Sequence, residues 1–197
     1  MTIPKLTDEY DQKSLYSSQN EHDACGVGLI LNLHGEKSHE IVENGLQVLE
    51  NMVHRGAESA DNKTGDGAGI LIQIPHEFIL LQGIPVPGKG KYGTGLVFLP
   101  KDEKKAELCL NVIKENVIKE GLTLLTIRDV PVNSDILGEI SASNEPTIKQ
   151  VFITGASSQD ELERKLYIVR KKLRKEFLNQ IYPKTVVSIL LVSRQNK

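Results

Sequence analysis

The order of the segments expected between residues 92 and 193 most constrains the fold of this 197-residue chain. Apolar runs typical of strands alternate there with two long stretches in which apolar residues recur at helical spacing. We expect strand, helix, strand, strand, helix and strand, in that order, at 92–99, 102–120, 122–132, 149–154, 159–178 and 185–193. This order resembles a split βαβ arrangement and indicates a mixed fold of helices and strands.

The preceding part of the chain also alternates between strand-like and helical patterns. A strand is expected at 25–33, a turn at 32–36 and an amphipathic helix at 38–54, capped by Ser38 and buried on one side. A polar, glycine-rich loop follows at 54–69, then a strand at 70–75, a short helix at 76–81 and a loop at 83–91. Residues 136–147 fit no single pattern.

Cys25 is the candidate nucleophile of this chain. It stands at the start of the expected strand, where Gly26 and Gly28 leave little bulk beside the thiol. Removal of the polar leader 1–24 would make it the N-terminal residue. The competing interpretation of the leader is a disordered tail, and that of Cys25 is a buried packing cysteine. The second cysteine, Cys109, lies on the apolar face of a helix and is expected to be inert.

Composition excludes several classes of function. A formal net charge of -2 argues against a nucleic-acid surface, and no apolar run is long enough to span a membrane. No secretory signal is present, and two cysteines form at most one disulfide, so we expect a reducing, cytoplasmic protein.

Three kinds of motif fail on their context. Gly83–Lys89 begins like a phosphate-binding loop but lacks the hydroxyl residue, and Gly88–Gly93 fits a dinucleotide fingerprint that no helix follows. The five histidines show no zinc-ligand spacing, and each is interpreted as a surface residue: His22, His34, His39, His54 and His76.

Three motifs in one order carry a resemblance. Cys25-Gly26-Val27-Gly28 is followed by a helix ending in His54-Arg55-Gly56-Ala57, and then by Thr64-Gly65-Asp66-Gly67-Ala68-Gly69-Ile70. The set resembles the class II glutamine amidotransferases, and its extended last motif resembles the large subunits of glutamate synthase. The resemblance is strongest over 22–75.

The resemblance implies a fold and a mechanism. The fold is the α+β, N-terminal-nucleophile hydrolase sandwich of four αββα layers with antiparallel sheets, incomplete here at its C-terminus. Residues 1–24 are a propeptide, and 25–197 are the N-terminal part of the amidotransferase domain. Cys25, freed at Ala24-Cys25, attacks glutamine and forms a thioester, with its own α-amino group as the base. Arg55 matches the family's arginine beside the nucleophile.

The same resemblance implies what lies outside this chain. We find no counterpart of the family's segments that clamp glutamine and bind its oxyanion, so we expect an N-terminal fragment of a longer polypeptide with little activity alone. A chain that keeps its leader would be an unprocessed precursor. FMN and an iron–sulfur cluster are implied for the rest of the parent enzyme, with none in this chain. The implied partners are glutamine, the remainder of the large subunit, and a small electron-donating subunit or ferredoxin.

Two other functional hypotheses stay open at this point. One is a non-catalytic regulatory or assembly module that keeps the fold, and the other is a different N-terminal-nucleophile amide hydrolase. The implied compartment is the cytoplasm, or the plastid stroma in a photosynthetic eukaryote.

Overall fold

The computed structural model describes residues 26–56, 58, 61 and 63–177. The chain divides into two compact units. Described residues 26–56 and 66–70 form unit 1, whereas those of 58–65 and 71–177 form unit 2. The leader 1–24, Cys25 and the strand expected at 185–193 all lie outside the described residues.

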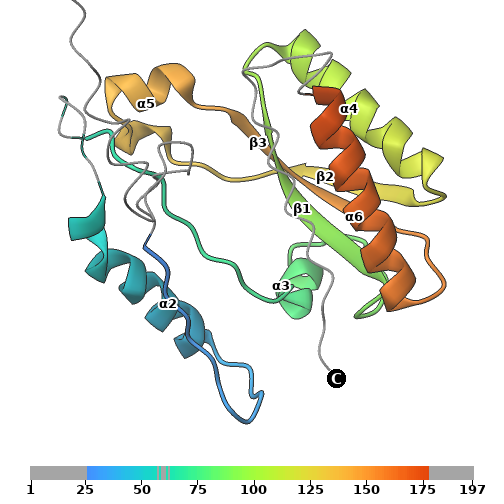
Figure 1. Ribbon diagram of the computed structural model, residues 1–197, viewed down its shortest axis with the longest axis horizontal. Helices are drawn as coiled ribbons and strands as arrows, with labels where there is room; N and C mark the ends of the chain where they lie inside the picture. The colour runs from blue at the N-terminus through green and yellow to red at the C-terminus, as the bar shows by residue number, and fades with distance from the viewer. Residues whose placement is uncertain (1–25, 57, 59–60, 62, 178–197) are drawn as a thin grey trace, which may run out of the picture. The chain divides into compact units, whose positions relative to one another are not determined.

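Unit 2 is built on a three-stranded sheet (Figure 1). Its strands are β1 (Tyr92–Leu99), β2 (Thr123–Asp129) and β3 (Thr147–Thr154), in the order β1-β3-β2. The central strand β3 pairs antiparallel with both neighbours, so β1 and β2 run parallel to each other and are joined through helix α4 (Glu103–Lys119). This confirms the split βαβ arrangement for the described strands.

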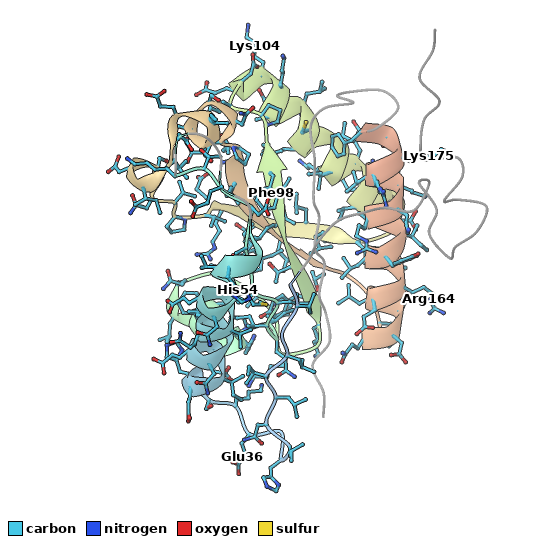
Figure 2. The ribbon with its side chains drawn as sticks, turned by 60° about the vertical axis from the view of Figure 1, so that its left-hand side comes forward. Glu36, His54, Phe98, Lys104, Arg164 and Lys175 are labelled. Carbon is cyan, nitrogen blue, oxygen red and sulfur yellow. The ribbon has the colours of Figure 1, made fainter. Side chains whose placement is uncertain are left out.

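The two faces of the sheet are covered differently because successive strand residues point to opposite sides. On one face, α4 and α6 (Gln159–Glu176) lie side by side and enclose the larger core (Figure 1). That core includes Val97, Val117, Val151, Leu166 and Val169. The outer side of α6 carries Arg164 and Lys175, which point away from the sheet (Figure 2).

On the opposite face, a smaller cluster surrounds Tyr92 and Phe152. The short helix α3 (His76–Leu81) contributes to it through Ile79, and Ile74 and Ile84 flank that helix. The predicted helix at 76–81 and the loop at 83–91 are both confirmed.

Local capping explains why the two long helices begin and end where the sequence predicts. The Asp102 side chain accepts a hydrogen bond from the Lys105 backbone N–H at 2.9 Å, and the Ser158 hydroxyl accepts one from Glu161 at 3.3 Å. After α4, Gly121 adopts φ +68°, a left-handed conformation that glycine reaches without strain. The ambiguous stretch at 136–147 contains the end of a 3-10 turn, η2 (Ser134–Ile136), and a short helix, α5 (Glu139–Asn144).

Unit 1 contains α2 (His39–Asn51) and a following 3-10 turn, η1 (Val53–Arg55). The turn predicted at 32–36 is present, with Gly35 at φ +72° donating to the Asn32 carbonyl at 3.1 Å. Ser38 occupies the N-cap position of α2 as predicted. The predicted apolar face is correct in its position but only half-buried, and no residue of α2 is fully buried.

Two predicted strands are wrong. Residues 26–33 and 70–75 form no strand, and the alternating apolar side chains of the first segment stay exposed, with Val27 88% and Leu33 90% accessible. A strand exists only through hydrogen bonds to a neighbouring strand. Among the described residues, none pairs with either segment.

Candidate active site

The structure describes the chain that follows the proposed nucleophile, but not the nucleophile itself. Cys25 lies outside the described residues, and the described chain begins at Gly26. The backbone of Arg55 closes η1, while its side chain is not described. The catalytic assignment of both residues therefore remains a prediction.

Gly28 fixes the segment after Cys25 against α2. A Cβ atom built on Gly28 would lie 2.3 Å from Cγ1 of Val48, so the backbone approaches the helix too closely for any side chain. The segment runs back along α2, so the start of the described chain, drawn in dark blue, lies at the end of unit 1 where α2 leads into η1 (Figure 1). The chain that follows Cys25 and the chain that carries Arg55 thus lie at the same end of this unit.

The 58–65 part of the polar loop after Arg55 belongs to unit 2. Its ends meet in an antiparallel bridge between Glu58 and Gly65. Inside it, Asp61 Oδ1 accepts hydrogen bonds from the backbone N–H groups of Thr64 at 2.8 Å and Lys63 at 3.2 Å, and Asp61 Oδ2 accepts one from the Thr64 hydroxyl at 2.6 Å. Asp61 therefore organises the loop from inside.

The same carboxylate lies against the start of α5. A Cβ built on Gly138, the N-cap residue of α5, would lie 2.3 Å from Asp61 Oδ2. Hydrogen bonds from the Thr64 hydroxyl and then the Thr64 backbone hold the pKa of the Asp61 carboxyl below its usual value. Asp61 is consequently a carboxylate at neutral pH.

Sequence reasoning did not single out Asp61. In the structure Asp61 carries a loop-structuring role through its bonds to Lys63 and Thr64. The available signal was an aspartate two and three residues before its backbone donors, the spacing of an Asx turn.

One of the five histidines contradicts its sequence interpretation. His76 is buried, with 8% of its surface accessible, because its Nδ1 lies 3.0 Å from the Tyr92 hydroxyl inside the smaller apolar cluster. His34, His39 and His54 are exposed as predicted, and His22 lies outside the described residues. Cys109 is fully buried in the larger core, as predicted, and burial raises the pKa of its thiol.

No group of three or more metal-ligating side chains gathers within the described part of the chain. The same residues contain no helix with the length and apolar character needed to cross a bilayer.

Comparison with known proteins defines the family. The model of the class II glutamine amidotransferases matches residues 25–195. Ferredoxin-dependent glutamate synthase 2 of Synechocystis is 42% identical over 168 residues, and the glutamate synthase [NADPH] large chain of Bacillus subtilis is 44% identical over 169. Glutamate synthase [NADH] of Saccharomyces cerevisiae is 42% identical over 178 residues.

These matches cover most of this chain but a small part of each relative. They include 82%, 81% and 82% of this chain, but only 11%, 11% and 8% of the Synechocystis, Bacillus and yeast proteins. The chain thus spans about a tenth of the length of these relatives. Because the family model covers nearly the whole chain from Cys25 onward, this chain belongs to the class II glutamine amidotransferases.

Proposed function

We propose that this chain carries the glutaminase part of a glutamate synthase and that Cys25 is its nucleophile. The observation that carries the proposal is the family match, which begins at Cys25 and spans the three ordered motifs. The similarity to several glutamate synthases supports the same substrate, glutamine, and the same product, glutamate.

The reaction follows from the chemistry of an N-terminal cysteine. A free α-amino group has a reference pKa of about 7.7–8.0, so it can accept the thiol proton near neutral pH. The Cys25 thiolate then attacks the side-chain amide carbon of glutamine and forms a tetrahedral intermediate. The amide nitrogen of the glutamine side chain takes up the proton and leaves as ammonia. This step yields a γ-glutamyl thioester. Water attacks this thioester, releases glutamate and returns the proton to the thiol.

Two parts of this proposal concern the site itself. Residues 1–24 are a propeptide, because a peptide bond to Ala24 would leave Cys25 without its free amino group. The guanidinium of Arg55 helps to hold the nucleophile and its surroundings. The start of the described chain and η1 lie at the same end of unit 1, which supports this pairing (Figure 1).

The finer fold proposal is one half of a four-layer αββα sandwich. An antiparallel sheet with α4 and α6 on a single face supplies one sheet layer and one helix layer. The other face carries half-buried strand residues beside the small Tyr92 cluster, which supports its role as the surface that meets a second sheet.

We place the remaining partners outside the matched region. Relatives named for ferredoxin, NADH and NADPH share this region at similar identity, so an electron-donating subunit or ferredoxin would bind elsewhere in the parent enzyme. The iron–sulfur cluster also belongs elsewhere, because the two cysteines, Cys25 and Cys109, are fewer than the four ligands of a cluster. We place FMN in the same outer part of the parent enzyme. Ammonia passes to a synthase site outside this chain. The compartment is the cytoplasm, or the plastid stroma in a photosynthetic eukaryote.

A glutamine-mimicking diazoketone tests the proposal, applied to the complete protein that carries this chain. We expect stoichiometric labelling of Cys25 and protection by glutamine, and no labelling of the Cys25→Ala variant. Intact-mass measurement should show a chain that begins at Cys25. A complete protein that keeps glutaminase activity after Cys25→Ala would refute the assignment, and a mass that includes residues 1–24 in an active enzyme would refute the propeptide.

A further inference from the structure

The 58–65 loop is the point at which the chain passes between the two units. Residues up to 56 and residues 66–70 belong to unit 1, whereas the loop between them belongs to unit 2. Because Glu58 and Gly65 are bridged, the chain enters and leaves the loop at adjacent positions. The segment that ends at residue 56 and the segment at 66–70 therefore both connect to the loop at the Glu58–Gly65 bridge, which we call the base of the loop.

That base is anchored on the connection between β2 and β3. A Cβ on Gly138 would lie 2.3 Å from Asp61 Oδ2, 2.7 Å from Thr64 Oγ1 and 3.0 Å from the Lys63 Cβ. Gly138 has φ −71° and ψ 162°, which any residue can adopt. Glycine is needed here for space alone, because the side chains of Asp61, Lys63 and Thr64 pack against Gly138 and leave no room for a Cβ atom.

Short tethers join this anchored loop to Arg55 of the proposed site and to the Asp66–Gly69 segment of the third motif. Arg55 precedes Glu58 by three residues, so their Cα atoms lie within about 11 Å at 3.8 Å per step. Asp66 follows Gly65 directly. A shift of the loop would therefore move the start of the Asp66–Gly69 segment and alter the reach of Arg55.

We propose that Asp61, seated on Gly138 and bonded to Thr64, is a positioning residue for the glutaminase site. It ties the β2–β3 connection to the loop from which the Arg55 and Asp66 segments depart. This inference rests on the proposed function. A misplacement of about 1 Å in a site of this kind costs about 100-fold in rate, which sets the expected effect.

The first measurement reports the anchor directly in the complete protein. Amide hydrogen exchange at Lys63 and Thr64 should become at least 10-fold faster in Asp61→Ala and in Gly138→Ala. Gly88→Ala is the matched control, because it adds the same methyl group in unit 2 where no described atom lies within 4 Å. It should leave exchange at both amides unchanged. Unchanged exchange in the Asp61 and Gly138 variants would overturn the proposal.

The second measurement reports the positioning. Labelling of Cys25 by the diazoketone is followed over a range of reagent concentrations. Asp61→Ala and Gly138→Ala should each lower the maximal labelling rate about 100-fold, with less than a 3-fold change in the half-saturating concentration. The resemblance places the substrate clamp outside this chain, which is why binding should be preserved. The double variant should be no more than 3-fold slower than either single variant, because both act on one contact.

Conservative changes guard against a variant that fails to fold. Thr64→Val keeps the side-chain shape but removes the hydroxyl donor to Asp61 and should slow labelling about 10-fold, whereas Thr64→Ser should restore the wild-type rate. A wild-type rate in Thr64→Val, or a double variant slowed by the product of the two single effects, would overturn the positioning role. A wild-type protein that resists the reagent would overturn the proposed function and this inference together.

Discussion

Replacement of Tyr92 by phenylalanine tests how the smaller cluster of unit 2 is held together. The Tyr92 ring is 1% accessible and packs 6.4 Å from the ring of Phe152, measured between centroids. Its hydroxyl lies 3.0 Å from Nδ1 of the buried His76. Tyr92→Phe keeps the ring and removes only this hydroxyl, so the change isolates one buried hydrogen bond.

The expected loss in the free energy of unfolding is about 1–3 kcal/mol, the cost of leaving a buried polar atom unpaired. The ring volume is retained, so the large cavity cost of a truncated core side chain does not arise. Urea unfolding at pH 7.5, followed by circular dichroism, measures the change if the slope with denaturant is the same in both proteins.

Tyr167→Phe is the matched control, since it makes the same chemical change on α6, where the side chain is 54% accessible. We expect a change within about 0.5 kcal/mol there. If Tyr92→Phe destabilised the protein no more than Tyr167→Phe, the buried hydrogen bond would not contribute to stability as argued.

The same pair predicts a dependence on alkaline pH. Burial, and then the negative charge of Glu77, raises the pKa of Tyr92 above its usual value of 10.0. Above about pH 10 the unfolded chain releases this proton while the folded chain keeps it, so folding stability falls as pH rises. Tyr92→Phe lacks this contribution. The difference in the free energy of unfolding between wild type and Tyr92→Phe should therefore shrink as pH rises above about 10.

Three further predictions concern unit 2. Cys109, fully buried with a raised thiol pKa, should resist iodoacetamide in the native protein and react only on unfolding, and native labelling detected by peptide mass mapping would contradict this. Hydrogen bonds from Ser157 and Lys165 lower the pKa of Glu161 from 4.5 to about 2, so its contribution to stability is present above pH 4.5 and lost as pH falls toward 2. Glu161→Gln should remove that part of the acid dependence of thermal unfolding, and an unchanged profile would count against it. Leu166→Ala should lower the free energy of unfolding by about 2–5 kcal/mol in urea, since the side chain is 2% accessible in the larger core; a loss below 1 kcal/mol would contradict that packing.

Much of unit 2 is readable from local signals in the sequence. Asp102 and Ser158 mark the starts of α4 and α6, and Gly121 marks the end of α4, because each acts on backbone groups within a few residues. Apolar alternation likewise locates β1, β2 and β3 to within a few residues. The three ordered motifs indicated the family that the comparisons confirm.

The same local signals failed where a partner was required. Apolar residues at 25–33 and 70–75 predicted strands, but no described strand pairs with the described residues of either segment. His76 looked like a surface histidine because its partner, Tyr92, lies 16 residues away in the sequence. The loop bonds of Asp61 had a local signal, the Asx-turn spacing, but its close approach to Gly138 did not, because Gly138 lies in a distant segment.

The sequence by itself determined the order of elements in unit 2, the positions of its helix ends, and the family to which the chain belongs. Only the tertiary structure decided that β3 lies between β1 and β2, that His76 is buried, and that Asp61 is seated on Gly138. The division has a physical reason. Capping and helical periodicity act between residues close in the chain, whereas strand pairing, burial of a polar ring and close backbone approach depend on which distant segments meet.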